Sequence, residues 1–108
     1  MLLILVSFCG YITKKGLASY CSDYYEGRTT ANDEIFRHNK GTAAQKLLPF
    51  GTRVKVVNLT NNKTVVVRIN DRGPYVKGRI IDLTKKAAKE IGILEDGVAK
   101  VKIRYKKK

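Results

Sequence analysis

The sequence has no tryptophan, one histidine and two cysteines among its 108 residues, and nine acidic residues stand against 22 basic ones. One histidine and two cysteines are too few for a zinc site built from the usual nitrogen and sulfur ligands, so we expect no metal and no cofactor. The three Phe and six Tyr follow no base-stacking pattern. We therefore expect no nucleic-acid partner.

Carboxylates are scarce enough to leave a net charge of +13 and a pI near 10.0. Charge of this size favours a polyanionic partner, which can be nucleic acid, an anionic membrane surface or an acidic wall polymer. The basic residues are spread along the chain and do not load one recognition helix. The length suffices for one domain but not for two, and we expect a monomer.

The sequence also lacks an apolar run long enough to span a bilayer, which takes about 20 residues. Its first nine residues, MLLILVSFC, are apolar and uncharged. We interpret residues 1–15 as a hydrophobic leader or signal remnant, which predicts export to the cell envelope, in the periplasm or wall. Cys9 is a candidate for lipid attachment, although bulky Phe8 precedes it, and a cleaved leader is the alternative. A disulfide from Cys9 to Cys21 is chemically allowed in an exported protein.

Residues 16–105 carry the pattern of one mainly β domain, and residues 106–108 form a basic tail. Alternating and β-branched segments predict strands at 17–22, 53–59, 64–69, 79–83 and 98–105. The second and third of these form a hairpin around Asn61-Asn62. Several short strands with one or two short helices predict a small barrel.

Two short helical segments are predicted between the strands. Thr84 is a suitable N-cap for a helix to about Ile91, with Gly92 as its stop. Thr42 to Leu48 can form a helical turn that Pro49 ends. Residues 23–30 are polar and rich in tyrosine, residues 31–41 read as a loop, and residues 70–74 form a dense turn cluster.

Four segments, taken in order, resemble the rare lipoprotein A family of double-psi β-barrel proteins. They are GLASY at 16–20, GRTTANDE at 27–34, TAAQKLLPFGT at 42–52, and VRINDRGP at 67–74 followed by GRIIDL at 78–83. The resemblance covers residues 16 to about 105 and implies a six-stranded double-psi β-barrel. Expansins and barwin-like proteins share this barrel, but they are usually rich in the disulfides and aromatic residues that this sequence lacks.

The resemblance implies a septal-ring lytic transglycosylase that acts on peptidoglycan in cell-wall remodelling. Members of the family are endolytic, prefer glycan strands stripped of peptides, and cut the β-1,4 bond between N-acetylmuramic acid and N-acetylglucosamine. The muramic acid 6-hydroxyl attacks in place of water and leaves a 1,6-anhydro end. One acid can serve both proton transfers, whereas ordinary glycosidases need a second carboxylate.

Asp71 matches the aspartate that is essential in the family, which makes it the candidate acid and base. It leaves a strand just before Gly73-Pro74, a rigid turn that would hold its carboxylate at the barrel mouth. The alternative is that Asn70 and Asp71 only make turn hydrogen bonds. Because Arg68 and Arg72 would favour the charged carboxylate, an acid here requires burial, or arginines turned toward the wall polymer.

Two further positions carry the family's catalytic pattern imperfectly. Glu34 falls at the family's A-N-G-E glutamate, where it would position or polarise groups near Asp71, although Asp33 replaces the glycine; a solvated loop carboxylate is the alternative. Gln45 stands where the family's T-A-A-H motif has a histidine, and glutamine cannot carry a proton. His38 could substitute for that histidine, although we expect an exposed loop residue.

Substrate contacts are expected from Arg68, Arg72 and Arg79, which can bind carboxylates or sugar hydroxyls. Tyr25 and Tyr75, together with Tyr24, are candidates to stack on sugar rings or to pack at the rim. Asp82 is expected to tie a barrel loop together. The predicted function is an exported lytic transglycosylase bound to glycan strands, with membrane association through the leader or a lipid on Cys9. The alternatives are a catalytically inactive peptidoglycan-binding barrel, because of Gln45, and an expansin-like wall-loosening protein.

Overall fold

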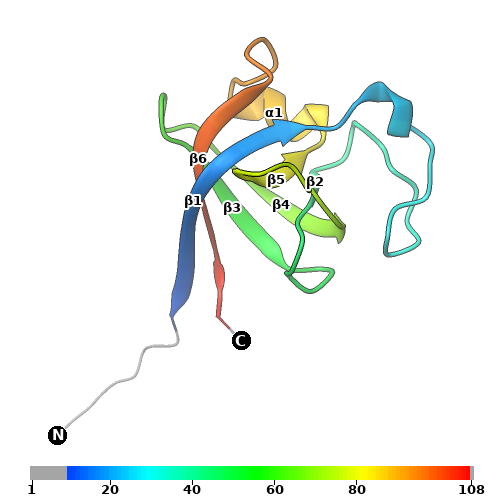
Figure 1. Cartoon of the computed structure of the whole chain (residues 1–108), viewed down its shortest axis with the longest axis horizontal. Coiled ribbons are helices and arrows are strands. Elements are labelled where there is room, and N and C mark those ends of the chain that lie inside the picture. Colours follow the sequence, from blue (N-terminus) through cyan, green and yellow to red (C-terminus); the bar gives the residue numbers. More distant parts are fainter. Residues whose placement is uncertain (1–9, 108) are drawn as a thin grey trace, which may run out of the picture.

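The computed structural model describes residues 10–107, in which six strands close into a barrel (Figure 1). In chain order the elements are β1 (Tyr11–Tyr20), the 3-10 helix η1 (Asp23–Tyr25), β2 (Thr42–Ala44), β3 (Arg53–Asn58), β4 (Thr64–Asp71), β5 (Arg79–Leu83), α1 (Lys85–Glu90) and β6 (Val98–Lys106). Around the barrel the strand order is β1-β5-β2-β4-β3-β6, which places β6 opposite β2. The predicted mainly β, six-stranded barrel is confirmed.

Two parallel pairings, β1 with β5 and β2 with β4, join strands that are distant in sequence. The other pairings are antiparallel. Side chains alternate between the interior and the solvent along the strands, as the period of a pleated strand requires. The interior is filled by branched aliphatic residues, with Val54, Val56, Val67, Ile69 and Ile103 at most 1% exposed. Each such burial contributes about 1.5–3 kcal/mol.

The hairpin and the helix form where the sequence predicts them. β3 pairs with β4 from Arg53–Arg68 to Val57–Thr64. The hydroxyl of Thr84 accepts a hydrogen bond from the backbone N–H of Ala87 and caps α1. Gly92 follows the helix with a φ of +75°, a conformation that glycine adopts without steric cost. Both predictions are confirmed.

The helical turn predicted from Thr42 to Leu48 is wrong at its start. Residues Thr42 to Ala44 form β2, a buried strand between β4 and β5. Thr42 caps no helix there, and its carbonyl accepts a hydrogen bond from the backbone N–H of Thr84. Small residues with weak local preference are drawn into this strand by the two neighbours that pair with it, which the local sequence does not reveal.

Strand ends also differ from the prediction. β1 begins at Tyr11, so residues 11–15, which the sequence assigned to the leader, pair with β6. It ends at Tyr20, just before Cys21, and β4 runs on to Asp71. Residues 1–9, including the candidate lipidation residue Cys9, lie outside the described residues. Within residues 10–107 no helix is both long and apolar enough to cross a membrane.

Candidate active site

A cleft of about 600 Å³ opens where β1, β4 and β5 end and the loops after them meet. Five of the predicted site residues line it: Tyr25, Asp71, Arg72, Tyr75 and Arg79. The other lining residues come from the end of β1, from β2 and β5, and from loops; they are Tyr20, Cys21, Ser22, Thr29, Phe36, Ala44, Gly73, Pro74, Val76 and Asp82. Glu34, Arg68 and Gln45 do not line the cleft, and each contacts it through neighbouring groups.

Asp71 is the last residue of β4 and lies beside Ala44 of β2. Its Oδ1 accepts hydrogen bonds from the backbone N–H groups of Ala31, at 3.0 Å, and of Arg72, at 2.9 Å. Two main-chain donors fix the orientation of the carboxylate at the cleft wall. Oδ2 has no hydrogen-bond donor among residues 10–107 and is the oxygen available to a ligand.

The two arginines nearest to Asp71 in sequence are both engaged elsewhere. Arg68 forms a two-pronged ion pair with Glu34, with Nη1 and Nη2 at 2.6 and 2.8 Å from its carboxylate oxygens. Arg72 donates from Nη1 to the carbonyls of Gln45 and Leu48, and its guanidinium stacks 3.9 Å from the centre of the Phe50 ring. The arginine side chains therefore organise the surroundings of the cleft and form no ion pair with Asp71 within residues 10–107.

Glu34 is held as a carboxylate. The Arg68 guanidinium, with smaller contributions from the Asn32 and Asn70 side-chain amides, lowers the pKa of Glu34 from its usual 4.5 to about 2. A group that is ionised at neutral pH cannot supply a proton to a leaving oxygen. The Glu34 side chain is 38% exposed, so it is partly solvated, but it is paired with Arg68 and hydrogen-bonded by Asn32 and Asn70.

Glu34 does not contact Asp71 directly but stabilises the loop whose backbone does. Its oxygens accept hydrogen bonds from Asn32, at 2.8 Å, and Asn70, at 3.2 Å, and the backbone N–H of Thr30 donates to its carbonyl. Ala31 lies between Thr30 and Asn32, and its backbone N–H donates a hydrogen bond to Oδ1 of Asp71. Asp33 has a φ of 71°, so the backbone keeps the left-handed conformation that a glycine at this position would adopt freely.

Gln45 stabilises a turn. Its Oε1 accepts hydrogen bonds from the backbone N–H groups of Leu47, at 2.6 Å, and Leu48, at 2.8 Å. Its own backbone N–H donates to the carbonyl of Asp71 at 3.1 Å. The contact between this position and Asp71 is therefore made by main-chain atoms, while the side-chain oxygen is occupied by the turn.

His38 is not the exposed loop residue that the sequence suggested, since its side chain is only 14% exposed. Its Nδ1 accepts a hydrogen bond from the backbone N–H of Lys85 at the start of α1. Its Nε2 lies 3.2 Å from Asp23, and its ring packs edge-on against Phe36. His38 does not line the cleft, so it does not replace the histidine expected at position 45.

Sequence reasoning missed a second carboxylate in the cleft. Asp82 of β5 accepts a hydrogen bond from the hydroxyl of Ser19 on β1, so it joins two paired strands where the sequence suggested a loop contact, and it also lines the cleft. Burial, followed by the nearby charges of Asp82 and Asp71, raises the pKa of the Cys21 thiol to about 12. The parallel pairing of β1 with β5 places these groups together, and the local sequence does not predict that pairing.

Exposed tyrosines and arginines complete the cleft. Tyr25 and Tyr75 are 50% and 75% exposed and both line it, so their rings are accessible to a sugar ring. Tyr24 packs edge-on against Tyr25 and lies under the guanidinium of Arg28. Arg79 also lines the cleft. Within residues 10–107 no group of three or more His, Cys, Asp or Glu residues is arranged to hold a metal.

Known proteins are similar to this chain in sequence. The family model described as lytic transglycolase matches residues 14–103. The chain belongs to this family. A probable endolytic peptidoglycan transglycosylase RlpA of Synechocystis is 57% identical over 88 residues, which make up 82% of this chain and 27% of that protein. The endolytic peptidoglycan transglycosylase RlpA of Pasteurella multocida is 50% identical over 87% of this chain and 32% of its own length. The chain thus spans about a third or less of these relatives.

Solved structures show the same barrel at low sequence identity. The Streptomyces papain inhibitor superposes with a TM-score of 0.71 at 20% identity, covering 89% of this chain and 96% of that protein. A Clavibacter michiganensis expansin superposes with a TM-score of 0.68 at 20% identity, covering 89% of this chain and 51% of the expansin. These similarities establish the double-psi barrel of this RlpA-like chain and say nothing of its chemistry.

Proposed function

We propose that this chain is an endolytic peptidoglycan lytic transglycosylase that acts in the cell envelope. The proposal rests on one observation above all. Asp71, at the position of the family's essential aspartate, lies in the cleft with one carboxylate oxygen held by two backbone N–H groups and the other free of protein donors within the described residues. The names of the RlpA relatives support peptidoglycan as the substrate.

In the proposed reaction Asp71 acts twice. It first donates a proton to the oxygen that joins N-acetylmuramic acid to N-acetylglucosamine, and the bond from that oxygen to the muramic acid C1 breaks. The 6-hydroxyl oxygen of the same muramic acid then bonds to C1, and its proton passes to the Asp71 carboxylate. The products are a free N-acetylglucosamine 4-hydroxyl and a 1,6-anhydro end. Glu34 serves as a positioning residue, because it orders the loop that supplies the Ala31 N–H group.

The remaining cleft residues are proposed to bind the glycan. Tyr25 and Tyr75 offer rings for sugar stacking, and Arg79 offers a guanidinium for hydroxyls or for a muramic acid carboxylate. Arg72 contributes by fixing the turn at 45–48, and Arg68 by holding Glu34. Membrane association through residues 1–9 or through a lipid on Cys9, a preference for peptide-free strands and a monomeric state belong to the same proposal.

A second candidate function is a peptidoglycan-binding barrel without catalysis. Gln45 favours it, because a glutamine whose oxygen caps a turn cannot carry a proton for the reaction. The two candidates share the cleft and its ligand and differ only in turnover.

One experiment separates them. The protein is incubated with peptide-free glycan strands, and 1,6-anhydro ends are measured by mass spectrometry beside the variants Asp71→Asn and Asp96→Asn. Asp96 is an exposed residue before β6, outside the cleft, and serves as the matched control. Loss of general acid and base catalysis predicts a fall of about 10²- to 10⁴-fold for Asp71→Asn only. Sedimentation with the strands without any anhydro product would refute the enzyme and favour the binding barrel. A large increase in 1,6-anhydro ends with the variant Gln45→His would then show that the wild-type protein lacks a protonatable side chain at this position.

A further inference from the structure

Three neighbouring strands on one side of the barrel carry many cations and no acidic residue. β1, β6 and β3 are neighbours in the sheet, and none of the nine acidic residues lies in them. Their outward side chains include seven cations, which we call the basic wall: Lys15, Arg53, Lys55, Lys100, Lys102, Arg104 and Lys106. Within residues 10–107 no salt bridge joins any of them to an acidic residue.

The strand register shows that these cations share one face. Val54 lies opposite Tyr105 and Val56 opposite Ile103, and all four are buried in the barrel interior. The alternate positions therefore point outward, where Lys55 lies opposite Arg104. On the other side of β6, Lys15 lies opposite Lys102.

Like charges that face each other across strands destabilise a sheet by about 0.2–1 kcal/mol per pair. The basic wall contains two such pairs, Lys55 with Arg104 and Lys15 with Lys102. Some cations elsewhere are neutralised, as Arg68 is by Glu34 and Lys86 by Glu90, whereas no salt bridge within residues 10–107 neutralises any cation of the basic wall. The repulsion within this row of cations is unfavourable for the fold, and the row fits a ligand that brings the missing negative charge.

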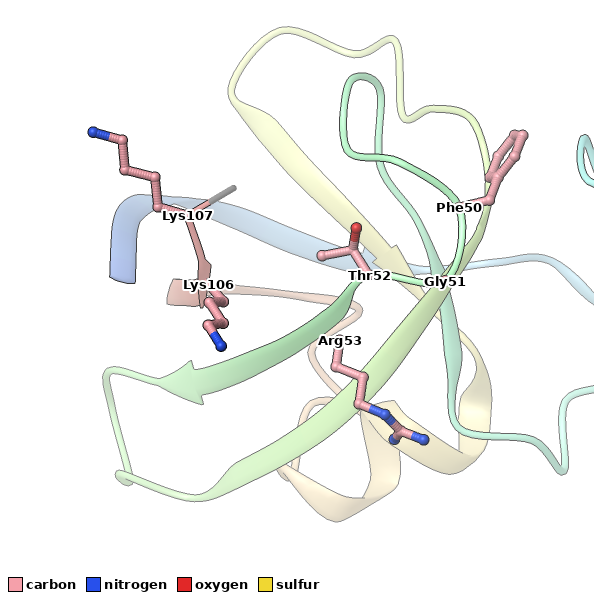
Figure 2. Close-up of a pocket in the computed structure, with 6 residues that line it drawn as sticks. All are labelled: Phe50, Gly51, Thr52, Arg53, Lys106 and Lys107. Atoms are coloured by element: carbon pink, nitrogen blue, oxygen red, sulfur yellow. The ribbon is translucent and has the colours of Figure 1, made fainter. Parts of the chain in front are cut away.

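The wall ends in a hollow next to the start of β1. A cavity of about 490 Å³ is lined by Arg53, Lys106 and Lys107 together with Phe50, Gly51 and Thr52. Figure 2 shows Lys106 at the end of β6 with Lys107 just after it, Arg53 at the start of β3, and the Phe50 ring on the far side of the hollow. Tyr11, 59% exposed, pairs with Lys106 and lies under the guanidinium of Arg104. Cations and an exposed tyrosine gathered at one end are typical of a membrane–water interface.

We propose that the basic wall docks on the anionic phospholipid headgroups of a membrane surface. Two observations favour a membrane over a soluble polyanion. The apolar residues 1–9 come before β1 in the sequence, so the chain combines an apolar segment with a basic surface. Stable attachment generally needs two such signals together. In addition, β6 lies opposite β2, so a docked wall leaves the cleft open to a glycan strand.

The test is co-sedimentation of the full chain with phosphatidylcholine vesicles, with and without about one third phosphatidylglycerol. The apolar residues 1–9 can bind either kind of vesicle, whereas the basic wall requires the anionic lipid. The wall variant combines four substitutions, and a control variant removes the same charge from exposed lysines elsewhere. The wall variant is K15Q/K55Q/K102Q/R104Q, and the control is K40Q/K46Q/K77Q/K89Q.

Each cation at an anionic surface is worth about fivefold in affinity, so we expect the four substitutions of the wall variant to lower its affinity for the anionic vesicles by about 100-fold or more. The control should lose far less, and added salt should weaken wild-type binding. Circular dichroism confirms that both variants are folded. If both variants lost the same amount of binding to the anionic vesicles, net charge alone would explain the binding, and the proposal would be overturned. It would also be overturned by equal wild-type binding to both vesicle types, or by tighter binding to soluble polyphosphate than to vesicles of equal charge.

Discussion

The ion pair between Glu34 and Arg68 should make stability depend on pH in a defined direction. The fall in the pKa of Glu34 from 4.5 to about 2 corresponds to about 3 kcal/mol of preference for the charged form. Since 38% of the Glu34 side chain and 37% of the Arg68 side chain are exposed, solvent screens the pair. We therefore expect Glu34→Gln to lower the free energy of unfolding at neutral pH by about 1 kcal/mol, or the melting temperature by about 4–8 °C.

The sign follows from the depressed pKa. The unfolded chain releases the Glu34 proton near pH 4.5 and the folded chain near pH 2, so the contribution is fully present above pH 4.5 and is lost as the pH falls toward 2. Urea unfolding at a series of pH values should show wild type and Glu34→Gln converging in this interval. Glu95→Gln, at an exposed loop residue outside the ion pairs found in residues 10–107, is the matched control and should change little. A deficit in Glu34→Gln that persists at the lowest pH would refute the reasoning, since it would show lost packing instead of lost charge.

Two further predictions test packing and solvent access. A Cβ atom added at Gly16 would lie 2.6 Å from Cγ2 of Ile80, so Gly16→Ala should cost about 1–3 kcal/mol in urea unfolding. A double-mutant cycle with Ile80→Ala should show favourable coupling, and additive costs would contradict the clash. Because the pKa of Cys21 is about 12, only about 10⁻⁴ of it is thiolate at pH 8. In a Cys9→Ser background a thiol reagent should therefore modify the folded protein far more slowly than the urea-unfolded chain, and comparable rates would contradict the burial of Cys21.

Features with a local cause could be predicted from the sequence. The hairpin of β3 and β4 follows from alternating β-branched residues, and α1 follows from the Thr84 cap and the Gly92 stop. Features that depend on distant pairing were missed. β2 is a strand only because β4 and β5 flank it, and Asp82 lies in the cleft because β5 pairs with β1. No local pattern encodes these parallel pairings.

The same distinction applies within the candidate site. The resemblance points to Asp71, and the structure places this residue in the cleft, although its catalytic role stays a prediction. Its sequence neighbours suggested that Arg68 and Arg72 would act on it directly. Their guanidinium groups instead bind Glu34 and the carbonyls of Gln45 and Leu48. Long side chains reach partners that are distant in sequence, so adjacency along the chain is a poor guide to which charges meet.

The replacement of the expected histidine by Gln45 has a narrower consequence than the motif suggests. Ala31 and Gln45 both contact Asp71 through main-chain atoms. The N–H of Ala31 donates to Oδ1 of Asp71, and the N–H of Gln45 donates to the Asp71 carbonyl. A change of side chain at position 45 therefore leaves these contacts in place, while the Gln45 oxygen adds its own cap to the adjoining turn. What the glutamine removes is the capacity to carry a proton at that point. If Asp71 performs both proton transfers alone, as one acid and base can, the main-chain hydrogen bonds that orient it do not depend on a histidine at position 45.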